Sequence, residues 1–443
     1  MTKCVITIAG SDPSGGAGIQ NDLKTIAAHG LHGASCITVL TVQNTGGLTA
    51  PSHFVDPLVV GNQIRAVAQD LHLDATKIGL LGNSAIAESV ASTLSSLKHG
   101  PTVIDPVIRT GTGHDLLADE PLDVLKPVLG LADVLTPNVP EAEYLSGISI
   151  DGVADAEEAA RKIIEMGPDS VVVTGGHLKD DPLDDILVTR ESTKVIGGNE
   201  VPGPTHGTGC TFSTSIACNL ALGWGLEESV ARAKRMTESA IANGTRIGSG
   251  NGPVNPLGSA LKESAALEAI EQVAVAVALL EQSPEFSQLL PQVGTNLAMA
   301  PAGADDITDV VGLSGRIVRV GNSARASGCP MRGGSSHMAR MALALRKRTE
   351  IMGCCMNIRF DRSILDVCGI LGLAISKFDR DDEPAGKDTM SWGLISAMGT
   401  APHDTPDVIY DEGSPGKEAM IRVLGRDPGD VSGKAIRIAR SLK

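Results

Sequence analysis

Short apolar runs alternate with longer segments of helical periodicity through residues 1–250. The runs are rich in Val and Ile and are bounded by Gly, Pro or Asp, which predicts buried strands. The longer segments repeat apolar residues with the spacing of one helix face. Strands separated by helices indicate an α/β domain whose largely parallel sheet is covered on both faces. We expect strands at 4–9, 34–41, 77–81, 103–105, 134–136 and 170–174, and helices at 20–29, 57–71, 84–97 and 154–166.

Polar and glycine-rich residues follow several of these predicted strands. Ligands of parallel sheets bind beyond the carboxyl ends of the strands, so these residues are expected to share one cleft. They are Gly10-Ser11-Asp12, Gln43-Asn44, Asp105-Pro106, Asn138 to Glu141 and Gly175-Gly176.

A glycine-rich turn at residues 206–211 leads directly into a helical pattern. The first turn of a helix has unpaired amides and a partial positive charge, so Gly207, Thr208 and Gly209 predict a site for anionic oxygens. The same field is expected to lower the pKa of Cys210 and favour its thiolate. A tight turn with a small packing cysteine is the simpler alternative.

The loop at residues 9–18 matches neither common nucleotide-binding motif. It lacks the Gly-x-x-x-x-Gly-Lys-Ser/Thr pattern, and the three Gly-Lys pairs of the chain are followed by Asp, Glu and Ala. It also lacks Gly-x-Gly-x-x-Gly. These absences disfavour a P-loop or Rossmann enzyme.

Residues 258–290 form a predicted helical lead-in to a second domain, so we expect domains at 1–257 and 258–443. The charge pattern changes near this boundary. Residues 1–290 hold 17 Lys and Arg against 34 Asp and Glu, whereas residues 291–443 hold 20 against 18. Arg supplies 14 of those 20 cations, which favours a phosphorylated ligand, although surface Arg content also varies between domains.

The segment 327–341 resembles the turn at residues 206–211, because glycines again precede a predicted helix. A Gly-Gly turn leads to serines that can cap the predicted helix that follows. Amides, hydroxyls and cations there would converge on an anion such as pyrophosphate, although a histidine in a first turn is more often structural. The residues concerned are Arg332, Gly334, Ser335, Ser336, His337 and Arg340.

Composition excludes several classes of protein. No uninterrupted apolar run reaches membrane-spanning length, and the first residues lack a signal-peptide pattern. The eight cysteines show no zinc-like spacing and are typical of reduced thiols in a cytoplasmic protein. A net charge of −15 disfavours nucleic acid as a partner. We expect a cytoplasmic homo-oligomer that binds small molecules and neither membranes nor nucleic acids.

Four motifs occur in order in the first part: 7–25 with its Gly-Ser-Asp-Pro-Ser-Gly-Gly-Ala-Gly core, Val42-Gln43-Asn44-Thr45, Thr136 to Glu141, and Gly-Thr-Gly-Cys at 207–210. Together they resemble the hydroxymethylpyrimidine/phosphomethylpyrimidine kinases of thiamine synthesis. The resemblance implies a ribokinase-like three-layer α/β/α fold, with ATP as co-substrate and Mg²⁺. It implies two successive phosphorylations of the pyrimidine.

The resemblance also implies roles for single residues. Gly207, Thr208 and Gly209 would hold the transferred phosphoryl group, and Cys210 would be the base. Gln43 would bind the aminopyrimidine, with Gly10 and Asp22 near the substrate. Mg²⁺ would be placed by Asn138 and Glu141, with Asp105 as a weaker candidate.

Each of these roles has a structural alternative. Asn138 and Glu141 could form an ordinary helix cap, Gln43 could be a strand-end turn residue, and Asp22 could be a solvated helix charge. The sequence also departs from the family, because Thr174 stands before Gly175-Gly176-His177 where a Lys is usual. A cation near the ATP phosphates is then missing.

Residues 270–443 resemble ThiN-type thiamine-phosphate synthase domains, through the Arg316 segment, Gly-Gly-Ser-Ser-His337-Met-Ala-Arg, Met356 to Asp361 and Asp411-Glu412-Gly413. The resemblance implies a smaller α/β domain that joins the pyrimidine pyrophosphate to thiazole phosphate. Arg316 and His337 would stabilise the departing pyrophosphate. Two alternatives stay open: a C-terminal domain that only senses thiamine phosphates, and a pyridoxal-type kinase.

Overall fold

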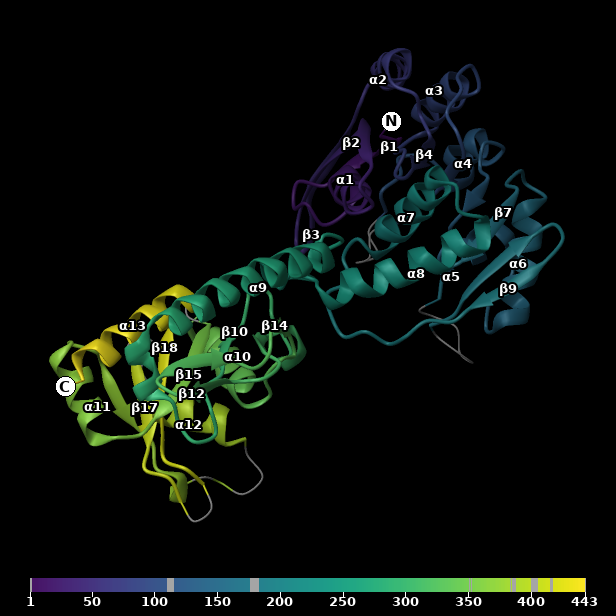
Figure 1. The fold of residues 1–443 in the computed structure, drawn as a ribbon. Coiled ribbons are helices and arrows are strands. Elements are labelled where there is room, and N and C mark those ends of the chain that lie inside the picture. The colour runs from purple at the N-terminus through teal and green to yellow at the C-terminus, as the bar shows by residue number, and fades with distance from the viewer. Residues whose placement is uncertain are drawn as a thin grey trace. The chain divides into compact units, whose positions relative to one another are not determined.

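The computed structural model describes residues 2–109, 115–175, 183–349, 351, 353–382, 384, 388–399, 405–414 and 417–442. The chain divides into two compact units, Met1–Ser259 and Ala260–Lys443, each with its own core (Figure 1). Each unit is described separately below.

The first unit is built on a nine-stranded sheet of order β3-β2-β1-β4-β5-β6-β7-β8-β9. Its central strands pair in parallel, as the sequence predicts, whereas β3, β8 and β9 add antiparallel edges that were not expected. The strands are β1 (Cys4–Ser11), β2 (His32–Asn44), β3 (Gly47–Phe54), β4 (Ala75–Ile78), β5 (Thr102–Ile104), β6 (Val134–Leu135), β7 (Ser170–Val173), β8 (Asp185–Thr189) and β9 (Thr193–Ile196).

Helices cover both faces of this sheet. On β1, Val5 packs toward the layer of α1, α7 and α8, while Ile6 and Ile8 pack toward the opposite layer. Strand side chains alternate between faces, so a continuous apolar run supplies both layers. The predicted three-layer α/β/α class is confirmed. The helices are α1 (Gly18–Ala28), α2 (Pro57–Asp70), α3 (Ser84–Leu94), α4 (Pro121–Leu129), α5 (Val139–Ser146), α6 (Val153–Ile164), α7 (Thr208–Leu222) and α8 (Leu226–Ala242).

The second unit is a smaller α/β domain, as expected, and its seven-stranded sheet has the order β14-β11-β10-β15-β18-β17-β16. All its pairings are antiparallel except that of β16 with β17. The strands are β10 (Leu297–Met299), β11 (Val311–Leu313), β14 (Pro330–Arg332), β15 (Cys354–Arg359), β16 (Ile375–Lys377), β17 (Val408–Asp411) and β18 (Met420–Gly425), with a separate hairpin of β12 (Ile317–Val320) and β13 (Ser323–Ala326).

Helices again lie on both faces of the second sheet. One layer holds α9 (Gly258–Gln282), α11 (Arg362–Ile370) and α13 (Pro428–Ser441), and Figure 1 shows α9 and α13 on the same side. The other holds α10 (His337–Thr349) and α12 (Thr389–Met398). Short 3₁₀ turns lie at Pro284–Leu289, Ile307–Asp309 and Arg380–Asp382.

The predicted lead-in helix is confirmed as α9, and it packs as expected into the core of the second unit. Val273, Val277 and Leu280 are buried there beside Phe286. None of the helices in the described ranges has the length and apolarity that a bilayer crossing requires.

Candidate active sites

The glycine-rich turn at the start of α7 has the geometry that the sequence predicts. Gly207 adopts φ 93°, and the helix begins at Thr208. A Cβ on Gly207 would lie 1.9 Å from the Gly16 carbonyl oxygen, so this turn and the first glycine-rich loop approach too closely for any side chain. The Thr208 amide donates to the Thr205 carbonyl oxygen at 3.3 Å, so the next amides of α7, those of Gly209 and Cys210, are the ones that helix geometry leaves for a ligand.

Asp12 connects the two glycine-rich segments, and sequence reasoning gave it no role. His206 Nε2 lies 2.9 Å from Asp12 Oδ2, and the amides of Gly16 and Ala17 donate to the same oxygen. Burial alone would raise the pKa of Asp12, but hydrogen bonds from His206, Ser14 and Gln43 hold it well below its usual range. The ionised carboxylate thus fixes the first loop against the start of α7.

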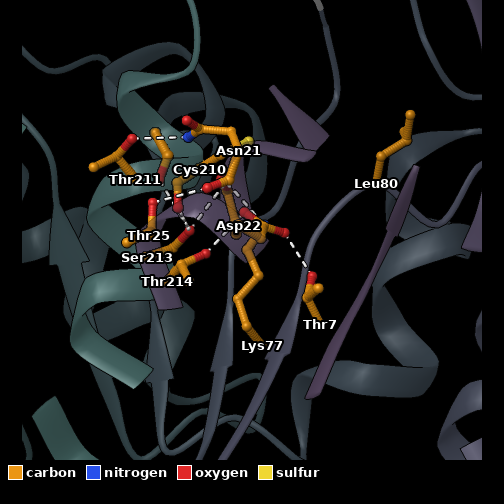
Figure 2. Close-up of polar contacts among 12 residues, drawn as sticks. Thr7, Asn21, Asp22, Thr25, Lys77, Leu80, Cys210, Thr211, Ser213 and Thr214 are labelled. Carbon is orange, nitrogen blue, oxygen red and sulfur yellow. Dashed lines mark hydrogen bonds and ion pairs between the residues drawn. The ribbon is translucent and has the colours of Figure 1, made fainter. Parts of the chain in front are cut away.

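A buried ion pair lies beneath this turn. Lys77 Nζ is 3.1 Å from Asp22 Oδ2 and 4.0 Å from Asp105 Oδ2, and Lys77 and Asp22 have no exposed surface. Thr7 and Thr214 donate to Asp22 at 2.5 and 2.8 Å. Figure 2 shows Lys77, Asp22 and the α7 side chains gathered in this cluster. The attraction of Asp22, Cys210 and Asp105 outweighs burial and raises the pKa of Lys77.

Asp22 is therefore not the solvated helix charge that the simpler alternative described. Its carboxylate oxygens accept from Thr7, Thr214 and Lys77 inside the protein. Its side chain has no exposed surface, so a role near the substrate would be indirect, and the expected place of Asp22 near the substrate stays a prediction. Its observed place is one layer below the site, where it neutralises Lys77.

The expected low pKa of Cys210 is also wrong for the protein alone. Burial raises the pKa of the Cys210 thiol to about 12, and Asp22 and Asp105 raise it further, while Lys77 and the Gly18 amide lower it. The open amides of α7 do not offset the loss of water around the sulfur. At neutral pH the thiol is protonated.

Two carboxylates face the predicted metal region. Ser213 donates to Asp105 Oδ2 at 3.3 Å, and this oxygen lies 3.8 Å from the position of a Cβ on Gly209. Burial, followed by the charge of Asp105, raises the pKa of Glu141 to about 8. Burial also raises the pKa of Asp105. Two buried carboxyl groups thus stand next to the anion site with little charge compensation.

Asn138 and Glu141 also form the helix cap that was the structural alternative to a metal site. The Glu141 amide donates to Asn138 Oδ1 at 2.9 Å, and the Asn138 amide donates to Glu141 Oε2 at 3.0 Å. Mg²⁺ keeps several waters and needs only one or two carboxylates, so the cap and a metal role are compatible.

The remaining predicted residues of the first unit border the same region. Gly10 is the second-last residue of β1 and is buried against Leu80, and Gln43 is the second-last residue of β2. Thr174 pairs with Asn138 in an isolated bridge. Gly176 and His177, which follow the position of the missing Lys, lie outside the described residues.

The second unit contains a cavity of about 590 Å³. It brings together most residues of the second predicted constellation, and the predicted helix after Ser336 is confirmed as α10. His337 is the first residue of that helix and is exposed, with its Nδ1 3.3 Å from Ser336 Oγ. The predicted residues that line the cavity are Arg316, Gly334, Ser335, Ser336, His337 and Arg340.

Arg332 does not line this cavity, so its predicted place in the anion site is wrong. Its guanidinium pairs with Asp309 at 2.7 Å and with Glu263. Arg332 ends β14, which pairs with β11, and none of the three β14 residues lines the cavity.

Several cavity residues were not predicted. Arg380 and Arg422 both pair with Asp411, and Asn296 and Asn357 line the floor between β10 and β15. The sequence offers one signal for these residues: Arg422 and Asn357 each stand in the centre of an apolar strand. Such residues are rarely buried without a partner or a ligand. The sequence alone does not show that strands so distant in order are neighbours.

Comparison with known proteins gives a family for each unit. Residues 12–255 match the family described as phosphomethylpyrimidine kinase, and residues 272–437 match that described as thiamine-phosphate synthase ThiN. The hydroxymethylpyrimidine/phosphomethylpyrimidine kinase of Haemophilus influenzae is 40% identical over 259 residues, which cover 57% of this chain and 96% of that protein. The thiamine biosynthesis bifunctional protein ThiED of Geobacter sulfurreducens is 40% identical over 253 residues, which cover 57% of this chain and 51% of that protein. The match thus spans about half the length of ThiED.

Solved structures resemble the first unit. The ADP complex of Bacillus subtilis pyridoxal kinase has 33% identity and a TM-score of 0.54, over 59% of this chain and 100% of that one. The AMP-PCP complex of Staphylococcus aureus pyridoxal kinase has 28% identity and a TM-score of 0.54, over 58% and 95%. The greater sequence identity to the pyrimidine kinases disfavours the pyridoxal kinase alternative. The chain belongs to the phosphomethylpyrimidine kinase family, and a domain of the thiamine-phosphate synthase ThiN family is fused after it.

Proposed function

We propose that the first unit phosphorylates 4-amino-5-hydroxymethyl-2-methylpyrimidine and then its monophosphate, and that the second unit joins the resulting pyrophosphate to thiazole phosphate. Membership of a kinase family implies ATP as the phosphoryl donor. The observation that carries the proposal for the first unit is the position of Cys210, which lies in the first turn of α7 directly above Lys77, Asp22 and Asp105.

In the proposed reaction, the turn of Gly207, Thr208 and Gly209 at the start of α7 holds the oxygens of the transferred phosphoryl group. The hydroxymethyl oxygen forms the new bond to phosphorus as ADP leaves, and its proton passes to the Cys210 thiolate, which forms when the protonated thiol first loses its own proton to solvent. Gln43 offers the pyrimidine both a donor and an acceptor. Lys77 is the cation that favours the thiolate, because its charge lowers the pKa of Cys210.

Asp105 and Glu141 fit a magnesium ion. Both are carboxylates, the ligands that Mg²⁺ prefers, and burial with mutual repulsion raises the pKa of Glu141 to about 8. Asp105 and Glu141 would hold Mg²⁺, which when bound would supply positive charge next to the Asp105 carboxylate and the phosphates. Asn138 would then orient Glu141 through the cap.

In the second unit, Arg316, Arg340 and the start of α10 surround the proposed pyrophosphate of the pyrimidine. The bond from the pyrimidine methylene to pyrophosphate breaks, and the thiazole nitrogen forms the new bond to that carbon. His337 and Arg316 stabilise the charge that develops on the departing pyrophosphate.

The purified chain with ATP, Mg²⁺, hydroxymethylpyrimidine and thiazole phosphate tests the proposal. The expected product is thiamine phosphate, with release of pyrophosphate, detected by mass spectrometry. If the pyrimidine pyrophosphate accumulates and no thiamine phosphate forms, the second unit is a ligand sensor. If the pyrimidine is not phosphorylated, the kinase proposal fails.

The assembly state also stays a prediction. Leu261, Leu267 and Val275 of α9 are about 60% exposed, and apolar side chains on one helix support the expected homo-oligomer. Light scattering with size-exclusion chromatography would test it, and a monomer would refute it. We likewise propose a cytoplasmic location.

A further inference from the structure

Three charged side chains form a buried cluster in the wall of the second unit's cavity. Arg380 Nε lies 2.6 Å from Asp411 Oδ1, and Arg422 Nη1 lies 2.5 Å from Asp411 Oδ2. The side chains of Arg380, Arg422 and Asp411 are 9%, 3% and 1% exposed, yet both arginines line the cavity.

The cluster holds two guanidinium groups and one carboxylate, so one positive charge is not balanced within it. An unbalanced buried charge is costly unless a ligand or another group compensates it. Arg422 stacks at 5.3 Å over the Phe378 ring, which fixes its plane but adds no negative charge. Two guanidinium groups facing a cavity are suited to the oxygens of a phosphate.

This cluster lies apart from the residues proposed for pyrophosphate. Ile317, which follows Arg316, forms a bridge with Thr295 just before β10. In the sheet, β10 is followed by β15 and then by β18, and β18 carries Arg422. Three strand spacings of about 4.8 Å separate the two backbones by roughly 14 Å. Asp411 holds the Arg422 guanidinium from β17, on the side of β18 away from Arg316.

Arg316 and Arg422 thus reach one cavity from strands that are well separated in the sheet, and the cavity offers two groups of arginines to two anions. We propose that Arg380 and Arg422 form a second anion subsite, which binds the phosphate monoester of the thiazole substrate. This inference rests on the proposed synthase function and assigns its second substrate to one wall of the cavity. The thiazole ring then lies between this subsite and the pyrimidine held near His337.

The test is an equilibrium titration of the full chain with three probes: thiazole phosphate, the unphosphorylated thiazole alcohol, and inorganic pyrophosphate. Arg380→Gln is expected to weaken thiazole phosphate binding about 10- to 100-fold, because it removes charged hydrogen bonds to the phosphate. Binding of the alcohol and of pyrophosphate is expected to stay unchanged. Arg380→Lys keeps the charge, so its affinity for thiazole phosphate is expected to lie between those of the wild type and Arg380→Gln. This variant also tests the subsite if Arg380→Gln does not fold.

Arg359→Gln is the matched control, because Arg359 pairs with Asp361 at 2.7 Å and does not line the cavity. It is expected to bind all three probes normally. The subsite is refuted if Arg380→Gln binds thiazole phosphate as the wild type does. It is also refuted if the variant loses affinity for the alcohol to the same degree, or loses affinity for pyrophosphate and not for thiazole phosphate. The titration measures binding without turnover, so it separates the subsite from the synthase function. If the wild-type chain binds thiazole phosphate through Arg380 but makes no thiamine phosphate, the synthase function is refuted and the subsite is not.

Discussion

Lys77 Nζ lies 3.1 Å from Asp22 Oδ2 in a region without exposed surface, and this pair joins β4 to α1 beneath the start of α7. The lysine also faces Asp105 and lowers the pKa of Cys210. One buried cation therefore faces two carboxylates, pairs closely with Asp22, and favours the thiolate of the proposed base. The pair connects the folding of the first unit to its chemistry.

Lys77→Met is expected to lower the free energy of unfolding by about 3–5 kcal/mol, because Asp22 is left buried without its cation. The double variant Lys77→Met/Asp22→Asn is expected to recover part of this loss and to remain poor as a kinase. Urea unfolding and initial rates of pyrimidine phosphorylation measure the two effects. Lys98→Met, at an exposed lysine, is the control. Wild-type stability and rate in Lys77→Met would refute the role of the pair.

Asp12→Asn is expected to reduce stability by about 1–3 kcal/mol at pH 7, because the charged hydrogen bonds of Asp12 are lost. The folded pKa of Asp12 is below its ordinary value of 3.8, so its contribution is complete above that value and disappears as the pH falls through the folded pKa. The gap between wild type and variant should therefore narrow below pH 3.8. Urea midpoints at several pH values check this, with exposed Asp70→Asn as control. A gap independent of pH would contradict it.

Arg332→Gln is expected to leave the Michaelis constants of the synthase step unchanged, since Arg332 pairs with Asp309 and Glu263 outside the cavity. Arg316→Gln, which changes a cavity residue in the same way, is expected to raise the Michaelis constant for the pyrimidine pyrophosphate about tenfold or more. Steady-state kinetics with that substrate supplied directly separate the two. If both changes raised the Michaelis constant equally, Arg332 would belong to the anion site.

Local sequence patterns were sufficient to predict the helix and sheet layers of the first unit and the start of α7. The apolar runs from Val5 to Val173 became parallel strands because burial on both faces requires such runs. Neither the antiparallel edge strands β8 and β9 nor the role of Lys77 was predicted. Lys77 was counted as part of a strand, although a charged residue in a fully buried strand requires a partner, and Asp22 lies far from it in the sequence.

The pKa of Cys210 shows why site chemistry is harder to predict than helix position. The sequence identifies the helix start, whose field favours a thiolate, but it does not give the burial of the sulfur or its distance from Asp105. Arg332 shows the same limit, because the sequence gives its charge but not its partners Asp309 and Glu263, which are distant from it along the chain.

The central claim is that two separate sites perform successive steps on one chain, and a mixing experiment tests it most directly. Cys210→Ala is expected to bind hydroxymethylpyrimidine but not phosphorylate it, and still to make thiamine phosphate from added pyrimidine pyrophosphate. His337→Ala is expected to accumulate that pyrophosphate. With ATP, Mg²⁺, hydroxymethylpyrimidine and thiazole phosphate, neither variant alone should make thiamine phosphate at the wild-type rate, whereas their mixture should restore it. Wild-type synthesis by Cys210→Ala alone, or no recovery in the mixture of two folded variants, would contradict the account.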